Sequence, residues 1–280
     1  MTTLPVPLTV AGLAAPESSG GAPGEVAGAY AHLYGLHLYY EIHGVARAGS
    51  PPLLLLHGGG STIQTSFGPI LPLLARTRRV IAFEQQGHGH TSDIPDRPFS
   101  FEQSAKDAVA LLRHLHVDCA DVLGYSNGGH IAIQLALDHP EIVNRIVIES
   151  AMASRDGSDR AFWEGFGRAT IDQMPRELRE AYLATAPHPE ELPTFFAKSV
   201  KRMAEFRGWS PDELGRIRSP ALVLLGDRDV VRPEHGVAMY RWLPDASLCI
   251  LPDTDHLAIV RHPEVAEIVE RFLVAGAGAR

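Results

Sequence analysis

The chain has 280 residues, of which 45% are apolar and 21% charged, and its formal net charge is −8 at pH 7. This composition excludes a largely disordered chain, and the acidic balance argues against a nucleic-acid-binding protein, because phosphate contacts need a basic face. The length suits one large α/β domain, or a core domain with one sizeable insertion.

Residues 14–28 are rich in Ala, Gly, Ser and Pro, and we expect the first 28 residues to form a flexible leader. They lack both the basic start and the uninterrupted apolar stretch of a signal peptide. No apolar run along the chain approaches the ~20 residues that are needed to span a bilayer. We therefore expect a cytoplasmic protein that does not associate with membranes.

From Ala31 onward, strand and helix patterns alternate. Alternating apolar positions over 31–43 predict an antiparallel hairpin. Helical spacing of apolar residues predicts helices over Phe101–His116, Gly128–His139 and Pro263–Val274. Short continuous apolar runs predict strands that are buried on both faces of a sheet: Leu53–Leu56, Val80–Phe83, Ala120–Leu123, Val143–Ile148, Ala221–Leu225 and Ser247–Leu251. This alternation predicts an α/β fold with a mostly parallel, doubly wound sheet.

Residues 152–218 interrupt this alternation, because they contain helix-like segments and no convincing strand. We interpret them as an inserted helical cap, which divides the core into 29–151 and 219–280. The cap has about twice the aromatic density of the rest of the chain. This excess suggests that some of its rings line a substrate pocket. The first candidates are three residues that follow the strand entering the cap: Phe162, Trp163 and Phe166. A fourth candidate is Tyr125, which directly precedes the candidate nucleophile described below.

A Gly-Tyr-Ser-Asn-Gly pentapeptide at 124–128 lies between a predicted strand and the helix that follows it. A sharp strand-to-helix turn of this kind lifts the central hydroxyl above the sheet, and its flanking positions must be nearly free of side chains. The N-terminus of the helix also favours negative charge that develops there. Ser126 is therefore the candidate nucleophile.

A serine hydroxyl needs a base, and the base needs a carboxylate that holds its tautomer. His256 lies between the last predicted strand and the final helix, in a loop that can return to the strand tops. Two carboxylates follow the preceding strand. Asp229 lies far enough out to reach His256, whereas Asp227 is better placed to hold the loop itself. Glu149, after the strand that enters the cap, is a third candidate.

Acyl transfer also needs N–H donors for the developing oxyanion. One donor should be the backbone of Asn127, the residue after the nucleophile. The other should come from the loop after strand 53–56, where three glycines at 58–60 let a bare N–H approach the substrate. Gly59 and Gly60 are the candidates, and the sequence does not choose between them.

Five segments in chain order resemble the α/β-hydrolase fold family, and the resemblance covers about 31–274: LLLLHGGGS, EQQGHGHTSD, GYSNGG, LLGDRD and PDTDH. It implies a catalytic triad of Ser126, Asp229 and His256, which follow one another in that family's order. The pattern is similar to the esterase, haloperoxidase-like and C–C-bond-hydrolase branches. Gln86 stands where many relatives have Arg, and Glu84 where Asp is more usual; we expect both to brace their loop.

Other kinds of site are less well supported. The run 88–93 imitates a metal-binding HxHxxD pattern, but no companion ligands follow at metal-site spacing. A hydroxynitrile-lyase-like site would need a cap lysine near the serine, and nothing places Lys198 or Lys201 there. Three other functions remain open, because all of them can use the same core residues. They are C–C bond hydrolysis, peracid formation, and ligand reception with slow turnover.

These residues together predict a serine esterase that cleaves small to medium carboxylic esters through an acyl-enzyme intermediate. The expected partners are a small-molecule ester and water, with no metal and no cofactor.

Overall fold

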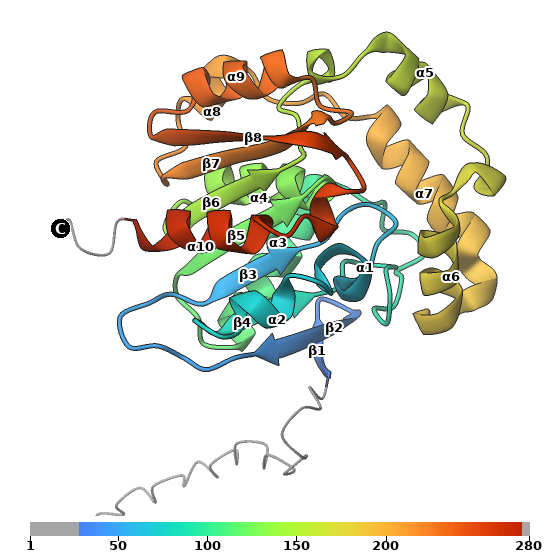
Figure 1. Cartoon of the computed structure of the whole chain (residues 1–280). Helices are drawn as coiled ribbons and strands as arrows, with labels where there is room; N and C mark the ends of the chain where they lie inside the picture. The colour runs from blue at the N-terminus through green and yellow to red at the C-terminus, as the bar shows by residue number, and fades with distance from the viewer. Residues whose placement is uncertain (1–27, 276–280) are drawn as a thin grey trace, which may run out of the picture.

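The computed structural model describes residues 28–275, so the predicted leader lies outside the described residues except for Gly28. One eight-stranded sheet runs through the molecule in the order β1-β2-β4-β3-β5-β6-β7-β8 (Figure 1). The β1–β2 and β2–β4 pairs are antiparallel and the remaining pairs are parallel. The strands are β1 (Ala29–Leu33), β2 (Leu36–His43), β3 (Leu53–Leu56), β4 (Val80–Phe83), β5 (Ala120–Tyr125), β6 (Val143–Glu149), β7 (Ala221–Arg228) and β8 (Ala246–Asp255).

Helices cover both faces of this sheet, which confirms the predicted doubly wound α/β fold. One face packs against α3 (Phe101–His114), α4 (Asn127–Asp138) and α9 (Pro233–Trp242). The other packs against α1 (Ile63–Phe67), α2 (Leu71–Leu74) and α10 (Val265–Val274), with the short turn η4 (Ile259–Arg261) before α10.

The continuous apolar runs of the inner strands follow from this two-sided packing. In β3, Leu54 and Leu56 belong to the core cluster under α3 and α4. Leu53 and Leu55 belong to the cluster under α1, α2 and α10. Because successive side chains of a strand point to opposite faces, every residue of such a strand must be apolar.

The last strand departs from the prediction. Ser247–Leu251 was expected to be buried on both faces, but Ser247 is exposed and the three residues after it are only half-buried. The reason is position, since β8 is the edge strand of the sheet. The sequence patterns also did not predict α9 or the short helices α1 and α2.

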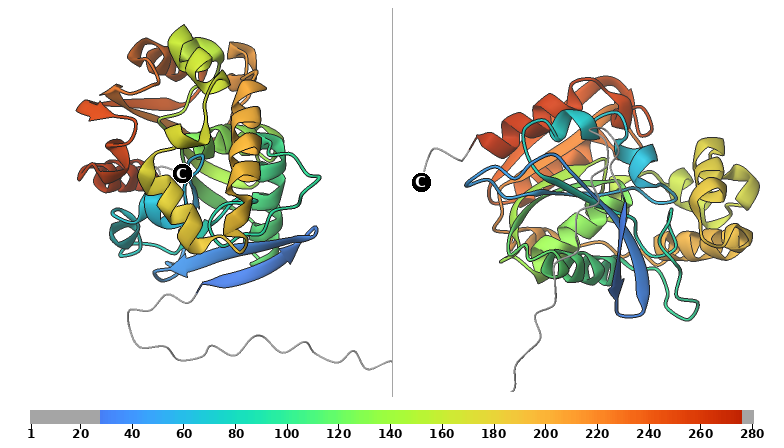
Figure 2. Two further views of the ribbon diagram at one scale, coloured as in Figure 1. Left: turned by 90° about the vertical axis from the view of Figure 1, so that its right-hand side faces the viewer. Right: turned by 90° about the horizontal axis from the view of Figure 1, so that it is seen from below.

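The chain between β6 and β7 is helical. In order it forms η1 (Arg155–Gly157), α5 (Arg160–Gly167), η2 (Ile171–Gln173), α6 (Arg176–Thr185), η3 (Pro189–Glu191), α7 (Leu192–Ala204) and α8 (Pro211–Leu214). Helices α5 to α7 stand beyond the C-terminal ends of the strands and lie across them (Figure 2). By contrast, α8 packs beside α4 and α9, and Leu214 is buried in the sheet's own core. None of the helices within 28–275 is both long and apolar enough to cross a membrane.

Candidate active site

Ser126 occupies the sharp turn that the sequence predicts between β5 and α4. Its backbone has φ 53° and ψ −118°, a conformation that non-glycine residues rarely adopt. The turn is tight on both sides: a Cβ on Gly124 would lie 2.1 Å from the Gly128 carbonyl oxygen, and a Cβ on Gly128 would lie 1.8 Å from the Leu56 carbonyl oxygen. Both positions therefore require glycine, and the strained residue between them presents its hydroxyl at the end of the sheet.

Two hydrogen bonds join the three predicted catalytic side chains. His256 Nε2 lies 3.1 Å from Ser126 Oγ, and His256 Nδ1 lies 2.7 Å from Asp229 Oδ1. The three residues follow β8, β5 and β7, so the parallel strands bring them to one edge of the sheet. The Asp229 side chain is completely buried, whereas that of His256 is 22% exposed. The serine is thus linked to a carboxylate that solvent does not reach.

Asp229 is held in its ionised form by its neighbours. Its carboxylate accepts hydrogen bonds from the Ser150 hydroxyl and, at 3.2 Å, from the Val231 N–H. Burial by itself raises the pKa of Asp229, but the hydrogen bond and charge of His256, together with these two donors, outweigh burial and hold the pKa below its ordinary value. An anionic Asp229 keeps the proton of His256 on Nδ1 and leaves Nε2 free to accept one.

The two other carboxylates considered from the sequence do not contact His256. Asp227 is exposed and accepts a 3.1 Å hydrogen bond from the Thr254 N–H, so it ties β7 to the end of β8. Glu149 is buried at the end of β6, and neither of its carboxyl oxygens has a hydrogen-bond partner within 28–275. Burial, reinforced by the charge of Asp229, raises the pKa of Glu149 to about 8.

The backbone around Gly59 lies against the residue after the nucleophile. A Cβ on Gly59 would lie 2.3 Å from Asn127 Nδ2, whereas one on Gly60 would face Met174 and Leu178 at 3.6 Å. Across the described part of the chain, the N–H groups of Asn127, Gly59 and Gly60 have no acceptor. Asn127, Gly59 and Gly60 line the same cavity as Ser126.

The loop that carries these glycines is held from below by His57. Its Nδ1 donates to the Gly58 carbonyl at 2.8 Å, and its Nε2 accepts from the Gln85 N–H at 3.0 Å. Burial lowers the pKa of His57 to about 4, so the ring stays neutral and keeps this donor–acceptor pattern. The Gln85 side chain also donates to the His57 carbonyl at 2.8 Å.

A cavity of about 290 Å³ opens above Ser126 and His256. Its walls are mostly apolar and come from both the strand ends and the helices above them. Of the predicted pocket residues, Tyr125, Phe162 and Phe166 line it; the sequence reading missed several others, among them Met152, Met174, Phe195, Phe196 and His130. For His130 a signal existed, because a residue four positions after Ser126 on a helix shares its face.

Trp163 is not part of this cavity, contrary to the expectation from the sequence. Its indole N–H donates to the Arg155 carbonyl at 2.8 Å, and its ring stacks on Phe206 with the centroids 5.9 Å apart. The Arg155 guanidinium lies 4.1 Å from the ring centroid. Because α5 turns by about 100° per residue, adjacent residues face different directions, and only Phe162 and Phe166, four apart, share the cavity side.

The model of the family with the alpha/beta hydrolase fold matches residues 51–204, more than half of the chain. The chain belongs to the α/β hydrolase fold family. It is similar to the human serine hydrolase BPHL (29% identity over 85% of this chain and 84% of the relative). It also resembles a poly(3-hydroxyalkanoate) depolymerase from Ectopseudomonas oleovorans (29% identity over 83% of this chain and 89% of the relative). Among solved structures, the enol-lactonase from Burkholderia xenovorans LB400 shares the fold, with a TM-score of 0.70 and 23% identity over 88% of this chain and 99% of that one.

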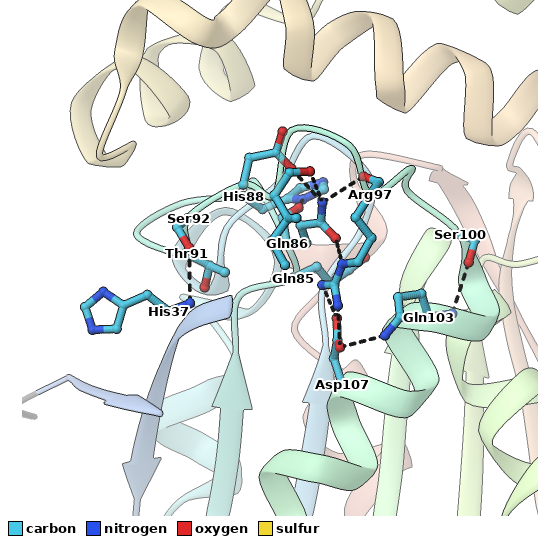
Figure 3. A network of polar contacts seen from close by, with 12 residues as sticks. His37, Gln85, Gln86, His88, Thr91, Ser92, Arg97, Ser100, Gln103 and Asp107 are labelled. Carbon is cyan, nitrogen blue, oxygen red and sulfur yellow. Dashed lines mark hydrogen bonds and ion pairs between the residues drawn. The ribbon is translucent and has the colours of Figure 1, made fainter. Parts of the chain in front are cut away.

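In this α/β hydrolase, the loop between β4 and α3 is braced around Gln86 (Figure 3). The Gln86 amide donates to Asp93 Oδ1 at 2.6 Å and to the Arg97 carbonyl at 3.0 Å, while its oxygen accepts from Arg97 Nε. Arg97 in turn pairs with Asp107 on α3 at 2.7 Å. Glu84 accepts from the backbone N–H of His90 at 2.6 Å. Both unusual residues of this segment therefore brace the loop, as expected.

The same loop anchors helix α7. Lys198 Nζ donates to Asp93 Oδ2 at 2.6 Å and to the carbonyls of Ile94 and Arg97 at 3.0 and 3.2 Å. Lys198 is therefore bound away from Ser126, and Lys201 forms an exposed pair with Glu205. These contacts account for both lysines structurally.

The side chains of the HxHxxD run point to separate partners. His88 Nδ1 donates to the Gln86 carbonyl at 2.9 Å, His90 pairs with Glu84, and Asp93 pairs with Lys198. Within the described residues, no group of three His, Cys, Asp or Glu side chains is arranged to hold a metal ion.

Proposed function

We propose that the protein is a serine esterase that hydrolyses small to medium carboxylic esters through an acyl-enzyme intermediate. The observation that carries this proposal is the hydrogen-bonded series Ser126–His256–Asp229, which opens onto a largely apolar cavity of about 290 Å³. We assign the three residues as nucleophile, general base and orienting carboxylate, respectively.

In the acylation step, Ser126 Oγ attacks the ester carbonyl carbon while its proton passes to His256 Nε2. The carbonyl oxygen becomes an oxyanion, which accepts hydrogen bonds from the N–H groups of Asn127 and Gly59. We choose Gly59 over Gly60 because its Cα lies against the Asn127 side chain. Collapse of the intermediate breaks the bond to the alkoxy oxygen, and His256 gives its proton to the departing alcohol.

In the deacylation step, a water molecule takes the place of the alcohol. His256 accepts a proton from this water as its oxygen attacks the acyl carbon, and the second tetrahedral intermediate uses the same two N–H donors. The proton then returns to Ser126 Oγ as the carboxylic acid leaves. The net reaction adds one water across one ester bond, and Asp229 remains ionised throughout.

We further propose that α5 to α7 act as the cap that limits substrate size. Phe162, Phe166, Phe195 and Phe196 all line the cavity. Each buried methylene of a substrate contributes up to about 0.8 kcal/mol of binding until the space is filled. The specificity constant kcat/KM should therefore rise with acyl length over short chains and then fall, because a cavity of this size does not hold a lipid-length chain.

A panel of ethyl esters of increasing acyl length tests the proposal, with a fluorophosphonate label as the control for a reactive serine. We expect hydrolysis with a maximum at short to medium chains and a single adduct on Ser126. Labelling of Ser126 without hydrolysis of any ester would overturn the esterase assignment and direct attention to C–C bonds or to ligand reception. A label elsewhere would overturn the assignment of the nucleophile.

A further inference from the structure

Asn127 brings a polar side chain to the cavity that opens above Ser126. It is the first residue of helix α4, and 6% of its surface is exposed. Its carboxamide makes no hydrogen bond within 28–275, yet neither Oδ1 nor Nδ2 is among the enclosed side-chain atoms that lack a partner. Both atoms therefore keep accessible surface. A polar side chain in this state is available to bond to a substrate.

The Asn127 amide nitrogen lies close to both backbone N–H groups that we assign to the oxyanion. A Cβ on Gly59 would lie 2.3 Å from Asn127 Nδ2. Because a backbone nitrogen is about 2.5 Å from the Cβ position of its own residue, Nδ2 is within about 5 Å of the Gly59 nitrogen. Bond lengths alone keep the side-chain nitrogen of any Asn within about 5 Å of its own backbone nitrogen. Donors that share one oxygen at about 2.9 Å each can be up to about 5.8 Å apart, so the three nitrogens are near enough to bond to the same atom.

The cavity offers an anion hydrogen-bond donors but no cationic Lys or Arg. No Lys, Arg, Asp or Glu lines it within the described part of the chain. The N–H groups of Asn127, Gly59 and Gly60 have no acceptor there, and no side chain caps the N-terminus of α4. Negative charge on a substrate oxygen must therefore be stabilised by neutral dipoles, and by His256 once it has accepted the serine proton. The Asn127 carboxamide adds a side-chain donor to the backbone donors.

We propose that Asn127 is a further catalytic residue, whose Nδ2 donates a third hydrogen bond to the oxyanion beside the N–H groups of Asn127 and Gly59. This bond strengthens as the carbonyl oxygen gains charge, so it stabilises the transition state more than the bound ester. Position 59 requires glycine for this arrangement, because a Cβ there would collide with the amide. The inference rests on the proposed function and adds one residue to its mechanism.

Asn127→Ala tests the third donor, because it removes the side chain and keeps the backbone N–H. We expect kcat on ethyl butanoate to fall about 10²-fold, the lower end of the effect of losing one oxyanion donor, with KM changing less than about threefold. Asn144→Ala is the matched control, since it removes the same carboxamide near the start of β6, where Nδ2 donates to Asp121 at 2.6 Å. Its kcat should stay within about twofold of the wild type.

Asn127→Asp separates hydrogen-bond donation from the filling of space. The two side chains have nearly the same shape, but an ionised carboxylate cannot donate a hydrogen bond and repels the oxyanion. We therefore expect a lower kcat at pH 7.5 for Asn127→Asp than for Asn127→Ala. A kcat at the wild-type level would overturn the proposal, since shape alone would then be sufficient.

A pair of ketone inhibitors shows at which stage Asn127 acts. Ser126 attacks a trifluoromethyl ketone to give a hemiketal with a charged oxygen, whereas the methyl ketone of the same chain length binds without reaction. Asn127→Ala should weaken binding of the trifluoromethyl ketone by about the same factor as kcat, and it should leave binding of the methyl ketone within about twofold of the wild type. Equal losses for the two ketones, or a higher KM with unchanged kcat, would overturn the proposal in favour of a contact to the bound ester.

Thermal unfolding distinguishes this role from a structural one. The Asn127 carboxamide has no hydrogen bond to lose within 28–275, so Asn127→Ala should keep the melting temperature of the wild type. A lower melting temperature together with wild-type kcat would overturn the proposal and leave Asn127 a packing role only.

Failure of this inference is distinguishable from failure of the proposed function. Ester hydrolysis that requires Ser126 but is equally fast in Asn127→Ala would overturn the third donor and leave the esterase assignment intact. If the wild type hydrolyses no ester, the rate constant for fluorophosphonate labelling of Ser126 still measures the donor, because the phosphonyl oxygen gains negative charge during the attack. Slower labelling of Asn127→Ala would then support the third donor, and equal labelling would overturn it.

Discussion

The strand-end loops and helices α5 to α7 border the same cavity but are held in place differently. The loops after β3, β5, β7 and β8 are bonded to one another through buried side chains and glycine contacts that leave no space for a Cβ. In contrast, α5 buries none of the residues in Arg160–Gly167, and α6 buries only Tyr182. Helix α7 has buried polar anchors as well, through Lys198 and Arg202 to the β4–α3 loop.

This difference separates two kinds of substitution. Changes at the strand ends act on a geometry that has no alternative arrangement, so they should reduce the rate of reaction for every substrate. Changes in the helices act on a weakly buried layer, so they should alter which substrate is preferred or how stably the layer is attached.

Ser126→Ala should lower ester turnover by roughly 10⁶-fold, because the catalytic group acts as a unit. Intact-mass spectrometry after fluorophosphonate treatment should show one adduct on the wild type and none on the variant. Circular dichroism should be unchanged. Activity that survives the substitution would mean that another residue attacks the substrate.

Asp229→Asn should lower kcat by roughly 10⁴-fold, since an amide favours the wrong tautomer of His256. Asp227→Asn is the matched control two residues away: its carboxylate is exposed and bonds only to the loop backbone, so kcat should stay within a few fold of the wild type. Steady-state kinetics on one ester measures kcat for both variants and shows which aspartate the reaction requires. Equal losses for the two variants would contradict the assignment of the carboxylate.

Glu149→Gln should remove a pH dependence of stability. The raised pKa, about 8, means that the folded protein keeps a proton which the unfolded chain releases above its ordinary pKa near 4.5. Wild-type stability therefore falls as the pH rises from about 4.5 to 8, by on the order of a few kcal/mol, and glutamine cannot ionise. Urea unfolding at pH 5, 6.5 and 8 measures the free energy of unfolding of both proteins. The value for the variant should rise relative to that of the wild type at each step in pH. Parallel curves would argue against a protonated Glu149.

Lys198→Met should destabilise the protein by about 2 kcal/mol, because it removes three charge-assisted hydrogen bonds that attach α7. It should also raise KM more than it lowers kcat, since α7 supplies cavity walls but no reacting group. Lys201→Met on the exposed side of the same helix is the control and should change stability by less than about 0.5 kcal/mol. Thermal and urea unfolding measure both.

Phe166→Ala and Trp163→Ala should distinguish an aromatic residue that lines the cavity from one that packs against another helix residue. Phe166 lines the cavity, so its removal should shift the best acyl chain to longer esters, with kcat/KM changing several-fold per methylene, as about 0.8 kcal/mol implies. Trp163 stacks on Phe206 instead, so its variant should lose thermal stability and keep the wild-type acyl profile. A shifted profile for Trp163→Ala would contradict its placement.

Much of the architecture could be predicted from local patterns. Residues 53–56 and 80–83 were predicted as strands and are β3 and β4, because a run of apolar residues buried on both faces has few other solutions. The edge strand β8 was misjudged, since a continuous apolar run does not reveal whether a strand has one neighbour or two. Short helices such as α1 and α2 have too few residues for a clear period.

The sequence by itself determined which residues could form the site. The glycines around Ser126 specify a turn that other residues cannot adopt, and the chain order of serine, aspartate and histidine follows from where the strands end. Tertiary structure decided everything that depends on direction and distance. Asp229 bonds to His256, whereas Asp227 bonds to the backbone of Thr254. Gly59, and not Gly60, lies against Asn127. Trp163 points away from the cavity, which His130 lines. Local sequence encodes backbone conformation, whereas burial and hydrogen-bond partners arise only when distant segments pack together.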